Sequence, residues 1–526
     1  MSQSIDSRLN RLIHTGQQHL LRNGLKGLEK ESLRLTPNGT ISHTRHPIGI
    51  GSALTHPYIT TDYSEALIEL ITPPYADPAE TLRFLKDLHS FVYRHLNDEI
   101  LLGTSMPCGV TSDESIPIAE YGTSNIGRMK HIYRRGLAYR YGRMMQAIAG
   151  VHFNYSVNEG LWPVLRELED GAESLASFIA DSYFGIVRNV HRHGWLTIYL
   201  FGASPAFSKS FFAGREHLAS RFSEFDARTL FRPYATSLRM SDIGYKNDSQ
   251  SGLDISFNNL EEYVASLGRA IETPYPLYER IGVKVDGEYR QLNSNILQIE
   301  NEYYSVVRPK QVAESGEKPT LALKRRGVRY LELRSLDLNC FSSAGASLDQ
   351  LRFLETFLLF CLLKQSPPLD SAEKAEISQN GMAVACCGRT PGFKLRRQGR
   401  EVFLKDWARE ILDGMRGIAE ILDAGDAFMP YTRSLEIQAA AVSDPDLTPS
   451  ARMLADMRAN GESYEDYALR ISKEHAQTFR DRFLSAERAE FFRRLTEESL
   501  EEQRQIEASD RLSFDEFLQR YFAQKE

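Results

Sequence analysis

The chain has 526 residues, of which 42% are hydrophobic and 25% charged, and its formal net charge is −7 at pH 7. This composition is typical of a globular protein with enough apolar material for a large core, and it excludes a disordered or membrane-embedded chain. The acidic balance gives no general attraction to nucleic acid or anionic lipid, so any anion site must be local.

The cysteines and the N-terminal residues bear on the compartment. The five cysteines lack the spacing of a disulfide framework or a zinc site: Cys108, Cys340, Cys361, Cys386 and Cys387. The first residues contain no continuous apolar run, so no secretory signal is visible. Residues 353–363 are apolar but shorter than the roughly 20 residues that cross a bilayer, which predicts a buried helix. We expect a cytoplasmic protein in reducing surroundings, without a membrane partner.

Hydrophobic spacing in chain order predicts helices alternating with strands. Helical spacing covers residues 6–22, 80–96 and 176–192. Strand-like runs cover residues 24–35, 148–156, 292–304 and 328–338. The pattern predicts a mixed α/β or α+β core, and the charge-rich spacing beyond residue 445 predicts a helical C-terminal lobe. We therefore expect a main domain over 1–445 and a helical lobe over 446–526.

The first strand carries acids on its apolar face. In GLKGLEKESLRL, Glu29 and Glu31 share a face with Leu25 and Leu33, because alternate side chains of a strand point the same way. An unpaired charge buried there would cost several kcal/mol, so both acids need a cation. The alternative is that they are solvated or paired with basic neighbours.

A second acidic segment is TTDYSEALIELITP. Asp62 opens an apolar run, and Glu69 stands between Ile68 and Leu70, where it is hard to keep in water. Asp62 as a helix N-cap is an alternative, since aspartate there accepts a backbone N–H. That interpretation leaves Glu69 unexplained.

The third segment, VRYLELRSLDL, places Glu332 and Arg334 on one strand face. A plain ion pair is the commoner explanation, but where phosphate is transferred a carboxylate binds the metal and a guanidinium the phosphoryl oxygen. The segment NILQIENEYYSVVRPK adds four polar residues: Gln298, Tyr304, Arg308 and Lys310. Oxygen ligands from separate strands favour magnesium or manganese over zinc. Magnesium implies phosphates, although no GxxxxGK[ST] loop is present.

Two further stretches are ambiguous. GRMKHIYRRGLAYRYGRMMQ is either the solvated face of a helix or an amino-acid pocket walled by Tyr133, Leu137 and Gln146. Its basic and aromatic composition would suit nucleic acid, but the charge of the whole chain speaks against that partner. In GVHFNYS, His152 shares a strand face with Asn154, and a lone histidine there is more often a core residue than a ligand.

These segments resemble the glutamate–cysteine ligases of the proteobacterial type, in the order of that family. The resemblance spans most of residues 20–345 and rests on these blocks: GLEKESLRL, GSALTHPYITTDYSEALIELITP, SMPCGV, AEYGTSNIGRMKHIYRRGL, GVHFNYS, YLFGASPA, PYATSLRMSDIGYKN, NSNILQIENEYY and YLELRSLDLN. It implies an α+β, glutamine-synthetase-like catalytic fold, in which an antiparallel sheet forms a half-barrel, plus the helical C-terminal region.

The resemblance also implies roles for individual residues. The metal ligands would be Glu29, Gln298 and Glu332 in one group and Glu31, Asp62 and Glu69 in another. His152, Glu332 and Arg334 would be catalytic, with Arg334 facing the transferred phosphate. The cysteine-binding positions would be Tyr63, Tyr133, Leu137, Gln146, Arg239, Tyr245 and Tyr304, and position 63 departs from the phenylalanine of a relative. Arg308 and Lys310 are expected at the nucleotide phosphates.

The implied activity joins the γ-carboxylate of glutamate to the amine of cysteine at the expense of ATP, the first step of glutathione biosynthesis. Magnesium, or manganese, would be the cofactor, γ-glutamyl phosphate the intermediate and glutathione a feedback inhibitor. A monomer is expected. Two alternatives remain: a ligase that uses ammonia or another amino acid, and a non-catalytic sensor, whose mark would be a missing metal carboxylate.

Overall fold

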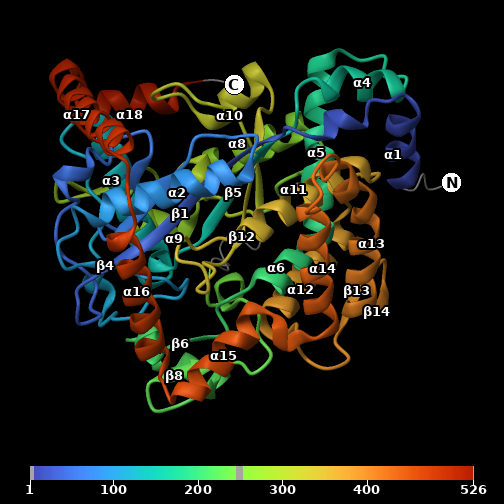
Figure 1. The fold of residues 1–526 in the computed structure, drawn as a ribbon. Helices are drawn as coiled ribbons and strands as arrows, with labels where there is room; N and C mark the ends of the chain where they lie inside the picture. The colour runs from blue at the N-terminus through green and yellow to red at the C-terminus, as the bar shows by residue number, and fades with distance from the viewer. Residues whose placement is uncertain (1–4, 245–252, 525–526) are drawn as a thin grey trace.

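The centre of the molecule is one open antiparallel sheet, seen edge-on among helices in Figure 1. The computed structural model describes residues 5–244 and 253–524. The path across the sheet is β11 (Val307–Lys310), β12 (Tyr330–Leu336), β5 (Val151–Ser156), β1 (Leu25–Leu35), β3 (Leu67–Ile71) and β2 (Ile59–Thr61). A further strand, β4 (Ile100–Leu101), pairs with the end of β1. All these pairs are antiparallel, which confirms the α+β prediction with an antiparallel sheet.

Three small sheets lie outside this centre. They pair β6 (Ala206–Ser208) with β8 (Thr229–Phe231) and β7 (Ser223–Glu224), β9 (Lys284–Val285) with β10 (Glu288–Tyr289), and β13 (Lys394–Arg397) with β14 (Arg400–Phe403). They are short hairpins and ribbons at the periphery, and none of them contributes to the large sheet.

Helices make up most of the remainder. Up to residue 326 they are α1 (Ile5–His14), α2 (Pro78–Tyr93), α3 (Asn125–Tyr141), α4 (Leu161–Leu168), α5 (Leu175–His193), α6 (Trp195–Phe201), α8 (Leu260–Glu272), α9 (Pro276–Ile281) and α10 (Pro319–Arg326). After it come α11 (Leu348–Leu363), α12 (Ser371–Cys387), α13 (Leu404–Leu422), α14 (Pro430–Ser443), α15 (Pro449–Asn460), α16 (Tyr464–Asp481), α17 (Ala486–Ser509) and α18 (Phe514–Phe522). Within the described residues, none of these helices is both long and apolar enough to span a membrane.

The strand prediction for residues 292–304 is wrong. Apart from one short turn of 3-10 helix and an isolated bridge between Asn295 and Pro274, the segment is irregular, because side chains bind much of its backbone. The Leu292 amide donates to Gln298 Oε1 (2.9 Å), and the Gln298 amide donates to Glu302 Oε2 (2.7 Å). The Gln298 side chain also joins the segment to α3.

The other predicted elements occur with shifted ends. The helix expected over 6–22 is α1 followed by a short 3-10 turn, because the chain reverses at Gly16, whose φ of 69° favours glycine. The apolar run 353–363 lies in α11 and is buried, as predicted. β1, β5, β12, α2 and α5 also match their predicted segments within a few residues.

The back face of β1 is buried as well as its front. Lys26, Lys30 and Arg34 point away from Glu29 and are at most 3% exposed. Each finds a partner far along the chain: Lys26 pairs with Glu355 of α11 at 2.7 Å, and Lys30 Nζ contacts His89 Nε2 of α2 at 3.0 Å. Both faces of the strand are therefore interior, which positions its side chains firmly.

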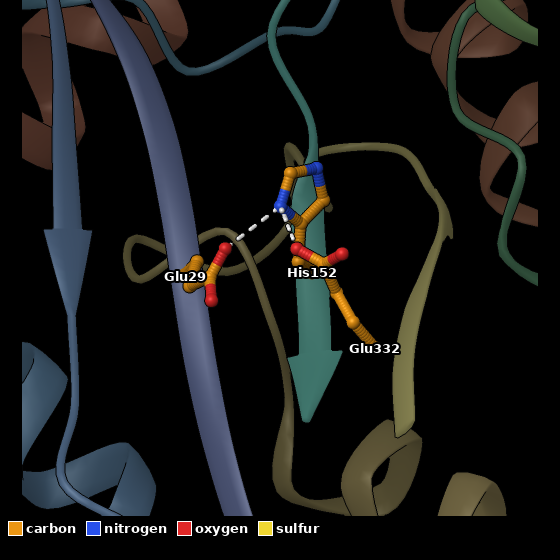
Figure 2. Close-up of side chains that lie close together, drawn as sticks. All are labelled: Glu29, His152 and Glu332. Atoms are coloured by element: carbon orange, nitrogen blue, oxygen red, sulfur yellow. Dashed lines mark hydrogen bonds and ion pairs between the residues drawn. The ribbon is translucent and has the colours of Figure 1, made fainter. Parts of the chain in front are cut away.

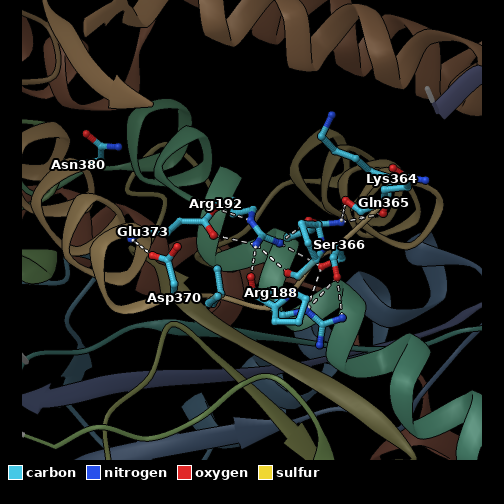
Figure 3. A network of polar contacts seen from close by, with 12 residues as sticks. Arg188, Arg192, Lys364, Gln365, Ser366, Asp370, Glu373 and Asn380 are labelled. Atoms are coloured by element: carbon cyan, nitrogen blue, oxygen red, sulfur yellow. Dashed lines mark hydrogen bonds and ion pairs between the residues drawn. The ribbon is translucent and has the colours of Figure 1, made fainter. Parts of the chain in front are cut away.

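Helix α5 is fixed to the segment that joins α11 to α12 (Figure 3). Arg188 donates to the carbonyl oxygen of Ser366 (2.8 Å), and Arg192 pairs with Glu373 (2.6 Å) and donates to the carbonyl of Pro367 (2.7 Å). A guanidinium can donate to several carbonyls at once, so the two arginines hold this irregular segment against α5.

The C-terminal helices pack back onto the N-terminal half. In Figure 1 the red helices α17 and α18 lie beside α2 and α3. Phe492 of α17 stacks near Phe84 and Phe91 of α2, and Asp87 accepts from Arg482 at 2.8 Å. The helical character after residue 445 is confirmed, whereas the domain boundary at residue 445 stays a prediction.

Candidate active site

Strand register brings the predicted acids together on one face of the sheet, which we call the acidic face. Glu29 of β1 lies opposite His152 of β5, and Glu31 lies opposite Glu69 of β3. Glu332 of β12 lies next, opposite Asn154 of β5. Paired residues of an antiparallel sheet point to the same side, so side chains from four strands meet there.

His152 stands at the centre of this face (Figure 2). Its Nδ1 lies 3.0 Å from Glu29 Oε2 and 3.5 Å from Glu332 Oε1. Its Nε2 lies 3.5 Å from Glu31 Oε1. The histidine therefore joins two groups whose ligand atoms lie within 4.8 Å of one another, Glu29–His152–Glu332 and Glu31–Glu69–His152.

Asp62 completes the second group from a turn. It follows β2 and precedes β3, so the N-cap alternative is wrong: no helix begins there. Its backbone carbonyl accepts from the Tyr121 hydroxyl (3.0 Å) and from Arg134 of α3. Its carboxylate is close enough to raise the pKa of both Glu31 and Glu69.

The Glu31 side of the face gathers acids whose ionised forms are disfavoured. Burial raises the pKa of Glu31. Burial also raises the pKa of Glu69 well above its ordinary value, and the carboxylates of Glu29 and Asp62 raise it further. Buried carboxylates that repel one another and accept few hydrogen bonds are the donor set that a hard divalent cation neutralises. The residues present thus fit magnesium or manganese.

The Glu332 side is balanced by cations. Burial disfavours the charge of Glu332, but Arg334 and Lys310 outweigh it and hold its pKa well below the ordinary value. Arg334 Nη1 lies 2.9 Å from Glu332 Oε1, and Lys310 Nζ lies 3.0 Å from Glu332 Oε2. This part of the face suits an anion beside a metal ion, because the cations line one side of the carboxylate.

Arg308 lies nearby but is turned to the backbone. It pairs in register with Glu332, yet its guanidinium donates to the carbonyls of Asn301 (3.0 Å) and Tyr303. Burial and the neighbouring Arg334 lower its pKa. Of the two cations expected at the nucleotide phosphates, Lys310 is the one that contacts the acidic face directly.

The Gln298 side chain binds backbone groups rather than the acids of the acidic face in the part of the chain that the structure describes. Its side chain is fully buried, where Oε1 accepts from the Leu292 amide and Nε2 donates to the Tyr133 carbonyl (3.2 Å). Gly136 of α3 makes room for it, since a Cβ at that position would lie 2.2 Å from Gln298 Oε1. Its role as a metal ligand stays a prediction.

The predicted cysteine-binding residues fall into two groups around the acidic face. Arg239 Nη2 donates to the Arg334 carbonyl (3.0 Å), and the Tyr304 hydroxyl contacts Met240 Sδ, which follows Arg239. Both residues therefore adjoin the Glu332 side of the acidic face. The other four lie near Asp62. Tyr63 follows it in the chain, Tyr133 and Leu137 belong to α3, and Gln146 comes shortly after that helix. Arg134 of α3 donates to the Asp62 carbonyl. Tyr245 lies outside the described residues.

Tyr63 differs from the rest of its group. It is 2% exposed, and its hydroxyl has no hydrogen-bond partner among the described residues. Burial raises its pKa, so the hydroxyl stays neutral.

Two functional neighbours carry no role in the sequence prediction. Asn154 donates from Nδ2 to Glu29 Oε1 (2.8 Å), and strand alternation alone had already placed it beside His152. Asp337 accepts from Ser204 (2.6 Å) and Ser237 (2.8 Å) and lies 3.9 Å from Arg239. No pattern in the sequence indicates Asp337, because its partners come from distant loops.

A sheet face that gathers carboxylates, a histidine and an arginine in contact is typical of enzymes that carry out phosphate chemistry with divalent metal ions. The family model for glutamate-cysteine ligase matches residues 9–384. A glutamate–cysteine ligase of Pseudomonas putida is 49% identical over 523 residues, with 99% of each chain covered. One of Azotobacter vinelandii is 48% identical over 526 residues, with the same coverage. The chain belongs to the glutamate–cysteine ligase family and is a ligase.

Solved structures agree with this assignment. The crystal structure of glutamate–cysteine ligase from Francisella tularensis in complex with AMP superposes with a TM-score of 0.89, at 38% identity, and covers 95% of this chain and 98% of that one. A bifunctional glutathione synthetase from Pasteurella multocida superposes with a TM-score of 0.72, at 26% identity, over 92% of this chain and 58% of the other. The fold is therefore that of this family along nearly its whole length.

Proposed function

We propose that the chain joins the γ-carboxylate of L-glutamate to the amine of L-cysteine through γ-glutamyl phosphate, with ATP converted to ADP and phosphate. The observation that carries this proposal is the contact of Glu29, His152 and Glu332 with Arg334 beside them on one sheet face. Transfer of a phosphoryl group needs positioning and charge neutralisation rather than an enzyme nucleophile.

The acids have a consistent division of labour in this proposal. Glu29, Glu31, Asp62, Glu69 and Glu332 would hold magnesium ions, with Gln298 a further ligand after a change of its hydrogen bonds. Bound there, the metal would supply charge neutralisation to phosphoryl oxygens. Arg334 would face the phosphoryl group, fixed by its contact with Glu332. Arg239 would bind the carboxylate of the substrate cysteine.

The nucleoside has a candidate place beyond the strand ends. A cavity of about 1180 Å³ is lined by Ser156, which follows Asn154 by two residues on β5, and by Gln311, which follows Lys310. Apolar side chains of α5 and α8 form its walls, among them Ile179 and Val264. Phosphates at Lys310 would therefore leave an adenosine group within reach of this cavity.

Three finer expectations belong to the same proposal. The protein would work in the cytoplasm, where its five free cysteines stay reduced. Glutathione would inhibit it by occupying the positions of glutamate and cysteine. It would act as a monomer.

The deciding experiment measures phosphate release from ATP with magnesium and glutamate, before and after adding cysteine. We expect release only when cysteine is present. Release with ammonia or other amino acids, but not with cysteine, would favour a ligase of another specificity. No release with any amine would favour a sensor, which the presence of every predicted carboxylate argues against.

A further inference from the structure

Asn154 occupies a position between two carboxylates of the acidic face. Its Nδ2 lies 2.8 Å from Glu29 Oε1, and in the strand register it stands opposite Glu332. It is distinct from the residues to which the proposed reaction gives a role, and an amide at this position has no obvious part in phosphate chemistry.

The orientation of this amide follows from the geometry of its contact. Asn154 Nδ2 faces Glu29 Oε1 at 2.8 Å, and a carboxylate oxygen accepts, so the amide presents its N–H group to Glu29. The other oxygen, Glu29 Oε2, faces His152 Nδ1 at 3.0 Å. Both oxygens of Glu29 are thus held, which fixes the rotation of its carboxylate.

One observation indicates that this contact is more than packing. Asn154 Oδ1 is buried without a hydrogen-bond partner among the described residues, whereas a purely structural amide normally satisfies both of its ends.

We propose that Asn154 is a positioning residue that orients Glu29 to bind the divalent cation of the acidic face. The inference rests on the proposed function for its metal but not for its substrates. Groups that orient metal ligands typically change metal affinity about 10–100-fold when they are removed.

The test compares Asn154→Ala and Asn154→Leu with wild type and with Asn158→Ala. Asn158 is a matched control, because its amide binds the Arg22 carbonyl (3.0 Å) in the turn after β5, away from the acids. Binding of Mn²⁺ without substrates is followed by the electron paramagnetic resonance signal of the free ion. Melting temperatures in EDTA check that each variant is folded.

We expect the alanine variant to bind Mn²⁺ about 10-fold or more weakly. The leucine variant has a similar size but cannot donate to Glu29 or bind a metal ion, so it should do no better than alanine. Asn158→Ala should bind as wild type does. If either Asn154 variant binds Mn²⁺ as tightly as wild type, the proposal is wrong.

Kinetics give a second readout and separate the two proposals. With ligase activity present, kcat should fall in both Asn154 variants while the KM for cysteine changes less than about 3-fold, since the amide does not face that substrate. A fall in kcat/KM that comes only from a higher KM for cysteine, with kcat unchanged, would contradict the positioning role. If wild type itself releases no phosphate, the proposed function fails, and the Mn²⁺ measurement still decides on Asn154.

Discussion

Arg334 and Lys310 keep Glu332 of the acidic face ionised, whereas burial and the acids around Glu69 favour its protonated form. A carboxylate held at a low pKa by an arginine is ready to bind a metal ion at any physiological pH. A carboxylate whose pKa is raised by burial and by its neighbours must first lose a proton. The two sides of one sheet face should therefore respond differently to mutation and to pH.

Arg334→Ala should lower kcat about 10²–10³-fold, because a charge aimed at the transferring phosphoryl group is lost. The fold should remain, since the side chain is 19% exposed and ends the polar cluster rather than filling the core. Steady-state phosphate release measures the effect. Arg416→Ala, on an exposed arginine of α13, serves as control and should retain wild-type kcat. An unchanged kcat in Arg334→Ala would remove this residue from the proposed chemistry.

Glu69→Gln should raise the melting temperature in EDTA and lower the gain that magnesium gives. The folded state binds a proton on Glu69 at a pH where the unfolded chain has released it, so wild-type stability falls as pH rises above the ordinary glutamate pKa. The variant lacks this loss, and its advantage should grow between pH 5 and pH 8. Thermal melts with EDTA test the expected rise in melting temperature, and melts with saturating magnesium test the expected smaller gain. An advantage that shrinks with rising pH would refute the raised pKa.

At the scale of the element, β1 determines the site because both of its faces are interior. Its back face carries lysines and an arginine that burial would penalise without partners. α2 and α11 supply the partners of the two lysines, and Glu99 pairs with Arg34 at 2.8 Å, so the strand cannot rotate or shift register without stranding a charge. The acids of the front face are thereby held in place.

Lys30→Met should stabilise the protein at neutral pH. Burial lowers the pKa of Lys30 to about 7, far below that of the unfolded chain. Unfolding therefore takes up a proton between pH 7 and about pH 10, and wild-type stability rises over that range. The variant should be more stable by about 1–3 kcal/mol at pH 7, with a smaller gap at pH 10. Urea unfolding at both pH values measures it. A gap that widens with pH would contradict the lowered pKa.

At the scale of the whole molecule, the C-terminal helices act as part of the core. α17 closes the hydrophobic surface of α2 with Phe492, which is fully buried, although some 400 residues separate the two helices. The same α2 supports the back face of β1 through His89. Loss of the packing between α17 and α2 should therefore also disturb the active site, because α2 supports β1.

Phe492→Ala should lower the free energy of unfolding by about 3–5 kcal/mol, the usual cost of removing a buried aromatic ring. Phe483→Ala is the matched control: Phe483 is 84% exposed, and its loss should change stability by less than about 0.5 kcal/mol. Chemical denaturation measures both. Equal effects of the two variants would mean that α17 is not part of the cooperative unit.

Some of this architecture could be predicted from residue order alone. Alternation along β1 and β12 placed Glu29 with Glu31, and Glu332 with Arg334, on one face each, because side-chain direction in a strand depends only on position. The helices α2, α5 and α11 follow from apolar spacing. The resemblance to the glutamate–cysteine ligases supplied the remaining site residues, including His152, which spacing alone would assign to the core.

Only the tertiary structure decided which strands pair and in which register. His152 meets Glu29 and Glu332, from strands some 300 residues apart, and Lys26 meets Glu355, because hydrogen bonding across the sheet and helix packing act between distant segments. Residues 292–304 are irregular despite their strand-like spacing, because their own side chains bind their backbone. Local sequence determines which way a side chain points, and the pairing of distant strands determines what it meets.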